Sequence, residues 1–505
     1  MKPLRDLLKH SSVYMIGQIL TRMASVLLLP FYTHVLTTAD YGVTAILDLT
    51  AAILSTFIAG GMVSAITRHH FDDGDTTHHN KVWWTGLTMV GLVCFIICIP
   101  MYLGRQTLAD VTLGSEIKFG AWFYTLTIAN LWFTVVVMIL DAYLRVMKWS
   151  GLFVVISLGR LIINVALNVY LMIGMDLGVE GLLIGNLIST ILHFVVMAAV
   201  FVQSRTGYSF DRILANDMFR FASPLVVSAL AGMLMHEADR YFLRIWVDMD
   251  EVGVYSFAHK IGFAVHTLCL LPFLSIWHVA VYDIERMDDA KKVFGKIFDW
   301  FSSGLGILIL GACLSVHPVL PFLTPDAYGP AIDLIAVVLL GFYLFAMSFM
   351  FEVPSLLTKR TKLMIPGSIV GLVVNVVANI ILIPILGAWG AGWAGVLTYL
   401  AYSATVLYYC RKADHISYPW LSSCIKVGLL VAAYFVVRLL VFPHVGSLMQ
   451  LFTSVAVCAI FAVCYFGKEG FPLLLEFLAK RRNKQANEDH SEGESYSTNE
   501  TLVTE

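Results

Sequence analysis

Long apolar runs, broken at intervals by glycine, proline or charged residues, dominate this chain. A helix needs about 20 apolar residues to cross a bilayer, and most of these runs are of that length. The pattern therefore predicts an all-α integral membrane protein with about 14 transmembrane helices. Their expected limits are 11–36, 41–66, 82–103, 117–141, 150–174, 180–202, 219–247, 252–276, 294–317, 328–352, 363–387, 390–410, 420–442 and 447–467.

The basic residues lie mostly in alternate loops between these runs. Examples are Arg145 and Lys148 in one loop and Lys359 in another, whereas the opposite loops hold few, such as Arg105. Loops rich in lysine and arginine stay in the cytoplasm. Most of the 33 basic residues then fall on one side. This predicts an even number of spans, with both termini in the cytoplasm.

Two parts of the chain match one another at an offset of 211 residues, which aligns Gly42 with Gly253 and Asn164 with Asn375. Six helices therefore recur as the next six in the same orientation, as in the parallel repeats of some secondary transporters. Further aligned pairs are Asp141 with Glu352, Lys148 with Lys359, and Asn168 with Asn379. The expected domains are six-helix bundles at 1–203 and 219–412, two added helices within 420–467, and a disordered cytoplasmic tail at 483–505.

Composition narrows the possible functions. Apolar residues make up 58% of the chain and charged residues 13%, about half the charged share of a soluble domain. This excludes a soluble enzyme, and the net charge of −2 argues against a nucleic-acid partner. No nucleotide-binding or hydrolase motif is present. We therefore predict a transporter with no catalytic residue, no metal and no cofactor, and interpret the histidine-rich segment 68–80 as a solvated cytoplasmic loop.

Charged residues inside the predicted spans are the candidates for a substrate site, because a charge at the bilayer centre costs about 2.5–3.5 kcal/mol or more. Arg22 and Arg160 lie near the middle of their spans, about 15 Å from the cytoplasmic end at 1.5 Å per residue. Neither has an obvious partner at that depth. Guanidinium groups bind phosphate through forked hydrogen bonds, so this pair suits a phosphate or pyrophosphate.

A second set of charges lies nearer the outer surface, at Asp48, Glu237, Asp239, Arg240 and Lys260. Asp239 and Lys260 lie on helices joined by a short turn, so these two side chains can meet. The set then forms an outer polar layer that changes partners during transport. The alternative is that such charges are paired and hold helices together, and the repeated asparagines are expected to bond neighbouring helices in this way.

Short motifs in four of the predicted helices resemble a known family, the polysaccharide-transporter (Wzx-type flippase) family of the multidrug/oligosaccharidyl-lipid/polysaccharide (MOP) exporter superfamily. The matching residues are Tyr14, Gly17, Arg22, Leu29-Pro30, Tyr32-Thr33, Leu36-Thr37, Asp40-Tyr41-Gly42, Asp239-Arg240, Gly253-Val254-Tyr255-Ser256 and Lys260. The resemblance implies a flippase of the bacterial inner membrane. Such a protein moves a lipid-linked oligosaccharide on undecaprenyl pyrophosphate by alternating access, for O-antigen, lipopolysaccharide or other surface-polysaccharide biosynthesis.

The expected partners are this lipid-linked substrate, membrane lipids and other polysaccharide-assembly proteins. The candidate substrate-binding residues are Arg22, Arg160, Asp48, Glu237, Asp239, Arg240 and Lys260. Two alternatives from the same superfamily stay open, a cation-coupled multidrug exporter and a peptidoglycan-precursor flippase. The midplane arginines disfavour the exporter, because cationic drugs require acidic residues. A membrane-embedded transferase is a further alternative, but no loop-lined catalytic pocket is apparent.

Overall fold

The computed structural model describes residues 28–72, 75–204 and 207–466, and these residues form helices and no strand. The helices before residue 205 are α2 (Leu29–Val35), α3 (Thr38–Ala59), α4 (Met62–His70), α5 (Thr76–Leu103), α6 (Arg105–Thr112), α7 (Gly120–Val146), α8 (Ser150–Val169), its π-helical extension η1 (Tyr170–Gly174), and α9 (Gly178–Ser204). The later helices are α10 (Arg212–Glu237), α11 (Asp239–Trp246), α12 (Met249–Glu285), α13 (Ala290–Leu323), α14 (Ala331–Phe351), α15 (Val353–Leu357), α16 (Ile365–Leu386), α17 (Ala388–Cys410), α18 (Trp420–Val436) and α19 (Ser447–Phe466). Short helical turns complete the set: η2 (Asp326–Tyr328), η3 (Thr361–Met364), η4 (Val437–Val441) and η5 (Phe442–His444).

Twelve helical stretches in the described part of the chain are long and apolar enough to cross a membrane, which confirms the predicted fold class. Every predicted span from 41–66 onward has a helical counterpart. The counterpart of 390–410 is α17, which is not among the twelve. Residues 11–27 of the predicted span 11–36 lie outside the described residues, and its last part contains α2.

The predicted span 219–247 is divided. The apolar pattern predicts a single helix over 219–247, but the structure ends α10 at Glu237 and begins α11 at Asp239. At the junction the backbone N–H of Tyr241 donates to the carbonyl of Ala238 at 3.0 Å, a tighter i to i+3 bond than an α-helix makes. Because of the break, the charged residues of this segment belong to two helices and do not share one helix face.

Helices α3 and α12 begin with similar local signals at repeat-related positions. Thr37 caps α3 by accepting from the backbone N–H of Asp40 at 3.1 Å, and the Asp40 carboxylate accepts from the N–H of Thr37 at 3.2 Å. Asp248, which is 211 residues later, caps α12 by accepting from the N–H of Glu251 at 2.9 Å. Such caps satisfy backbone donors that the first helical turn leaves free. The local chemistry therefore fixes where both helices start.

The ends of α7 and α15 also match. Lys148 and Lys359 both adopt the left-handed backbone conformation, with φ of 59° and 56°. The following residues close the same ring, because Trp149 N–H donates to Leu144 O at 3.0 Å and Arg360 N–H donates to Ser355 O at 2.9 Å. This is the hydrogen-bond pattern of a Schellman helix end.

The two repeat-related glycines meet where α3 and α12 cross. A Cβ atom on Gly42 would lie 2.2 Å from the carbonyl oxygen of Met249, and one on Gly253 would lie 1.9 Å from that of Thr38. The Thr38 hydroxyl also donates to the Asp250 carboxylate. Only glycine permits backbones to approach this closely. The contact holds the N-terminal ends of the two helices together.

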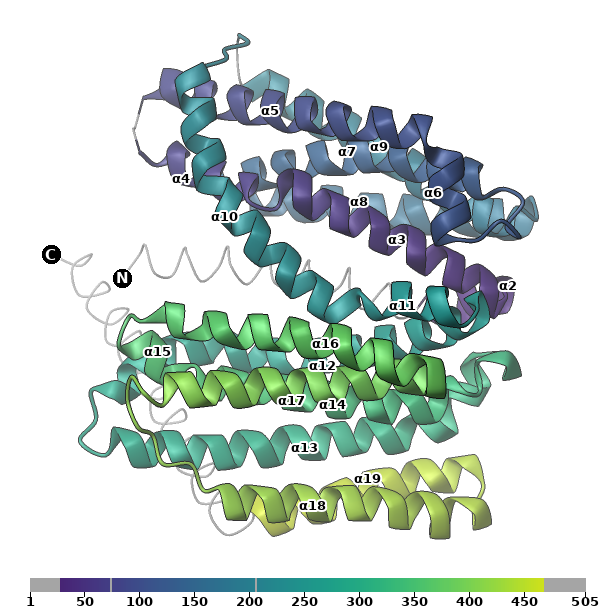
Figure 1. The fold of residues 1–505 in the computed structure, drawn as a ribbon, viewed down its shortest axis with the longest axis vertical. Helices are drawn as coiled ribbons and strands as arrows, with labels where there is room; N and C mark the ends of the chain where they lie inside the picture. Colours follow the sequence, from purple (N-terminus) through teal and green to yellow (C-terminus); the bar gives the residue numbers. More distant parts are fainter. Residues whose placement is uncertain (1–27, 73–74, 205–206, 467–505) are drawn as a thin grey trace, which may run out of the picture. The chain divides into compact units, whose positions relative to one another are not determined.

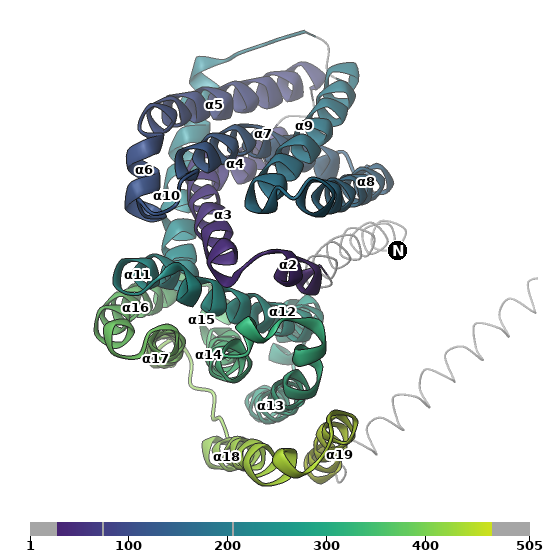
Figure 2. The same cartoon turned by 90° about the vertical axis from the view of Figure 1, so that its right-hand side faces the viewer.

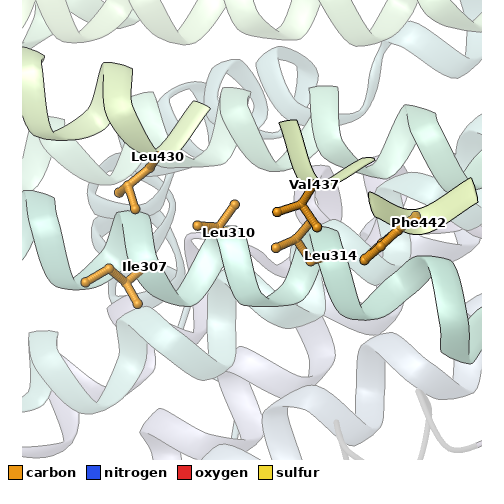
Figure 3. Close-up of a cluster of buried hydrophobic side chains, with 6 residues drawn as sticks. All are labelled: Ile307, Leu310, Leu314, Leu430, Val437 and Phe442. Carbon is orange, nitrogen blue, oxygen red and sulfur yellow. The ribbon is translucent and has the colours of Figure 1, made fainter. Parts of the chain in front are cut away.

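The chain divides into two compact units, one formed by Met1–Arg286 with Leu320–His415 and the other by Met287–Val319 with Ile416–Glu505. Within the first unit, α12, α14, α16 and α17 run side by side, as the two views show (Figures 1 and 2). Within the second, α13 packs against α18 and its continuation through a cluster of buried side chains (Figure 3). The cluster consists of Ile307, Leu310, Leu314, Leu430, Val437 and Phe442.

Candidate functional site

A cavity of about 380 Å³ lies within the first unit, between α3, α9 and the segment from α10 to α12. Asp48 follows the first residue of α3 by ten positions, so at 1.5 Å per residue it lies about 15 Å along the helix from Thr38. The lining residues are Tyr32, Leu36, Tyr41, Thr44, Ala45, Asp48, Leu49, Ala52, Leu182, Asn186, Met233, Glu237, Arg240, Ser256, His259, Lys260 and Phe263. Four of the predicted site residues, Asp48, Glu237, Arg240 and Lys260, are therefore brought together.

Arg240 is held in place by three neighbours. Its Nη1 donates to Glu237, its Nε donates to the Ser256 hydroxyl at 3.0 Å, and its Nη2 lies 3.2 Å from His259 Nδ1. Because a guanidinium only donates, His259 Nδ1 must accept and its proton sits on Nε2. Arg240 is thus oriented and already neutralised by a carboxylate.

Lys260 is the less satisfied cation of the cavity. Its Nζ lies 5.8 Å from the centre of the Tyr41 ring, within reach of a cation–π attraction. Asp48 lines the same cavity, yet the described residues include no ion pair to Lys260 within 4 Å. An ammonium with an aromatic neighbour and an open cavity in front of it is able to bind an incoming anion.

Asp239 lies elsewhere, and the expectation that it meets Lys260 is wrong for the described structure. Its Oδ1 accepts from the side-chain amides of Asn375 at 3.0 Å and Asn379 at 2.6 Å, and its Oδ2 accepts from the Tyr255 hydroxyl at 2.6 Å. The side chain is turned into the bundle of α11, α12 and α16, because three donors there satisfy the carboxylate. The predicted bonding of Asn375 and Asn379 to a neighbouring helix is confirmed.

Arg160 lies outside the lining of the cavity and has partners that could not be anticipated from the sequence. Its Nη2 donates to the Thr190 hydroxyl at 3.2 Å, and its Nη1 lies 3.4 Å from His193 Nδ1. The other ring nitrogen of His193 lies 3.4 Å from an Asp141 oxygen. Arginine, histidine and aspartate thus form a chain from α8 through α9 to α7, in which the guanidinium balances the carboxylate. Arg22 lies outside the described residues.

Other polar residues complete this picture. Arg244 pairs with Glu116 at 2.6 Å, away from Arg240. Asn164 donates to Asn186 at 2.8 Å and to Ser189 at 3.0 Å, which confirms the predicted helix-to-helix bond. Within the described ranges, no cluster of His, Cys, Asp and Glu has the geometry of a metal site.

Tyr41, Ser256 and His259 line the cavity but were not among the predicted site residues. The repeat contained a signal for His259, because an offset of 211 residues aligns it with Asp48. An apolar or uncharged side chain in a span gives no comparable signal, so the aromatic lining could be found only from the fold.

Comparison with known proteins gives a family and a fold. The family model described as "Polysaccharide biosynthesis protein" matches residues 7–276, more than half of the chain. No curated protein sequence matches significantly.

Solved structures share the fold at low sequence identity. A structure titled lipid II flippase MurJ in an inward closed conformation matches with a TM-score of 0.75 and 14% identity, over 90% of this chain and 99% of that one. An inward-facing MATE multidrug transporter of the MOP superfamily matches with a TM-score of 0.58 and 13% identity, over 82% and 99%. A MATE transporter of Vibrio cholerae matches with a TM-score of 0.54 and 15% identity, over 81% and 96%. The chain belongs to the polysaccharide biosynthesis protein family and has the fold of the MOP-superfamily flippases and transporters.

Proposed function

We propose that this protein flips a lipid-linked oligosaccharide, carried on undecaprenyl pyrophosphate, across the bacterial inner membrane. The observation that carries the proposal is the cavity that Arg240 and Lys260 line together, between helices that are apolar enough to cross a membrane. A pyrophosphate is the part of such a lipid that cannot enter the apolar bilayer unaided. Family membership supports the link to polysaccharide biosynthesis.

Binding of the pyrophosphate begins at Lys260 in this proposal. Arg240 already has Glu237 as its counter-ion, whereas Lys260 lies beside the ring and hydroxyl of Tyr41 and has no ion pair among the described residues. A phosphate that binds Lys260 brings negative charge next to Arg240, which can then exchange Glu237 for a phosphate oxygen. Asp48 repels the same anion, which favours release once the cavity opens. Tyr32, Tyr41 and Phe263 offer apolar faces to the sugar.

The remaining candidate residues keep different parts in the proposal. Arg22 is predicted to contribute a second phosphate-binding guanidinium, so Arg22→Ala should abolish flipping while the protein still inserts. Arg160 and Asp239 were predicted to touch the substrate as well. In the described conformation both are engaged by neighbouring side chains, and contact with the substrate requires those bonds to change during the cycle.

Alternating access follows from the crossing of α3 and α12. In the predicted orientation, with both termini in the cytoplasm, the Gly42–Gly253 contact lies at the outer surface. Asp48 lies six residues after Gly42, about 9 Å deeper along α3, so in this proposal the contact closes the outer path while it holds. We propose that the bundles 1–203 and 219–412 rock about the cavity and that the contact separates when the substrate leaves.

Deletion of the gene tests the proposal. Cells without the protein should accumulate lipid-linked glycan in the inner leaflet and lose surface polysaccharide, and the wild-type gene should restore both. Unchanged polysaccharide with no accumulation would refute it. Loss of viability with accumulation of peptidoglycan precursor would instead identify the peptidoglycan-precursor flippase.

A cation exporter is the second candidate, and one observation favours it. Asp48 and Glu237 both line the cavity, and carboxylates are the groups that a cationic drug requires. The discriminating measurement is drug susceptibility after overexpression. Increased resistance to cationic drugs that is lost in Asp48→Asn would favour export, whereas unchanged susceptibility together with restored polysaccharide would favour the flippase.

A further inference from the structure

Glu352 is a buried carboxylic acid for which the described structure provides no cation. It lies between α14 and α15, and its residue is only 7% exposed. It is the N-cap residue of α15, yet its side chain makes no capping hydrogen bond. Nearby hydroxyls are engaged elsewhere, because Ser348 donates to the Phe345 carbonyl at 2.7 Å and Ser355 donates to the Arg360 carbonyl at 2.9 Å.

The titratable groups that face Glu352 are acidic or neutral. From α17 these are Tyr402 and Cys410. Among the described residues of α12, α15 and α16, no charged side chain has a resolved electrostatic interaction with the Glu352 carboxyl. The basic residues of the following turn, Lys359 and Arg360, are exposed and form no ion pair with it.

The aligned carboxylate of the first half has a different environment. Asp141 contacts His193, which in turn contacts Arg160. The offset of 211 residues aligns Arg160 with Gly371 and His193 with Ala404. At Gly371 the space next to the backbone is filled by Tyr402 and Met235 rather than by a guanidinium. The second half has therefore kept the acid and lacks both of its basic partners.

An isolated carboxylate in a low-dielectric interior is unfavourable by several kcal/mol or more, and such a group is instead neutral. A conformational change that exposes it further to water favours the charged form. We propose that Glu352 is a proton-binding site, and that proton release from it during the conformational cycle couples a proton gradient to transport. The coupling part of this proposal rests on the proposed flippase function. The step is a simple acid dissociation, in which the carboxylic acid gives a carboxylate and a proton that passes to water.

Infrared spectroscopy of the full-length protein in lipid vesicles tests the site, with the proton itself as the probe. Wild-type protein at neutral pH should show a C=O stretch from a protonated carboxyl that is absent in Glu352→Gln. Asp141→Asn is the matched control and should leave this band unchanged, because Asp141 has a basic partner. Identical spectra of wild type and Glu352→Gln would overturn the proposal.

Tyr402→Phe covers the case in which Glu352→Gln does not fold. It keeps the acid and removes a neighbouring phenol, so the C=O stretch should shift without loss of intensity. An unchanged spectrum in a folded Tyr402→Phe protein would count against a neutral Glu352 beside this ring.

A cellular experiment tests the coupling. Deletion cells carrying wild type should make surface polysaccharide in an amount that falls when a protonophore is added, whereas Glu352→Gln should give a low amount that the protonophore does not change. A response equal to that of wild type would overturn the coupling. Failure of wild type itself to restore polysaccharide would refute the flippase function and leave the infrared result standing.

Discussion

The two halves of this protein share helix starts, helix ends and aligned polar positions, yet their charged side chains have different environments. In the first half, Asp141, His193 and Arg160 face one another within one bundle. In the second half, Arg240 and Lys260 face the cavity, and Glu352 has no cation among the described residues. The two halves therefore share the local motifs that fix their helix ends, whereas their charged side chains have different partners.

This difference indicates a division of labour. Charges that satisfy each other inside a bundle hold helices in place, because removing one partner leaves the other unpaired in a low-dielectric environment. Charges that face a cavity remain available to a ligand. Among the described residues, Asp48 is therefore the charged cavity residue of the first half, and the cavity cations Arg240 and Lys260 belong to the second half.

Loss of Lys260 should produce the largest effect. Lys260→Met removes the less satisfied cation of the cavity, so polysaccharide export in a complemented deletion strain should fall to near background while membrane insertion is unchanged. Lys260→Arg keeps the charge and should retain part of the activity. Lys412→Met, an exposed lysine away from the cavity, is the control. Wild-type export by Lys260→Met would remove Lys260 from the site.

Loss of Arg160 should affect folding more than binding. Arg160→Met leaves the partly buried Asp141 without its balancing cation, and removing one partner of such a charge network destabilises the fold. Thermal unfolding in detergent should occur at a clearly lower temperature. The double variant Asp141→Asn with Arg160→Met should recover most of this loss. A variant with normal unfolding but no transport would instead support the predicted role of Arg160 in binding the substrate.

Alanine substitutions at the two glycines of the α3–α12 contact should have similar effects. Gly42→Ala and Gly253→Ala each place a Cβ atom against a backbone carbonyl of the other half, so both should separate α3 from α12. A cysteine introduced at Ala45, which lines the cavity, should then react faster with a water-soluble thiol reagent from outside. Gly91→Ala, where no heavy atom lies within 4 Å of the added Cβ, is the control. An effect at only one of the two glycines would contradict a shared contact.

The smallest expected effect is a difference in unfolding free energy between variants of two repeat-related asparagines. Asn375 donates to the Asp239 carboxylate, whereas Asn164 donates to neutral groups of α9. Bonds to charged acceptors contribute more, so Asn375→Ala should cost about 2 kcal/mol and Asn164→Ala about 1 kcal/mol. Chemical unfolding of the two variants in the same detergent measures this. Equal losses would mean that the carboxylate adds nothing.

The fold was largely predictable because membrane helices leave a simple signal. Bilayer thickness requires long apolar runs, and these runs located the helices from 41–66 onward. Helix caps such as Thr37 and Asp248 are local motifs that mark helix starts. The break at Ala238 has no comparable signal in the sequence. It depends on tertiary packing and not on an interruption of the apolar pattern.

The candidate site was predictable in part. Charges inside spans are rare, so Asp48, Glu237, Arg240 and Lys260 were found from position alone. The direction in which each side chain points was not predictable, since Asp239 lies one residue before Arg240 yet its side chain turns into the bundle toward Asn375. The partners of Arg160 were also hidden, because histidine and threonine in a span look like ordinary helix residues until the fold brings them together.

The lysines at the two matching helix ends have a consequence for biogenesis. A left-handed backbone costs a non-glycine residue roughly 1–2 kcal/mol, so glycine would be the more stable choice at positions 148 and 359. Glycine, however, would remove a positive charge from loops that hold the topology during insertion. A lysine-to-glycine exchange at either turn should therefore stabilise the finished protein and weaken the orientation of the nascent chain. Thermostabilisation of this protein would need a compensating lysine nearby.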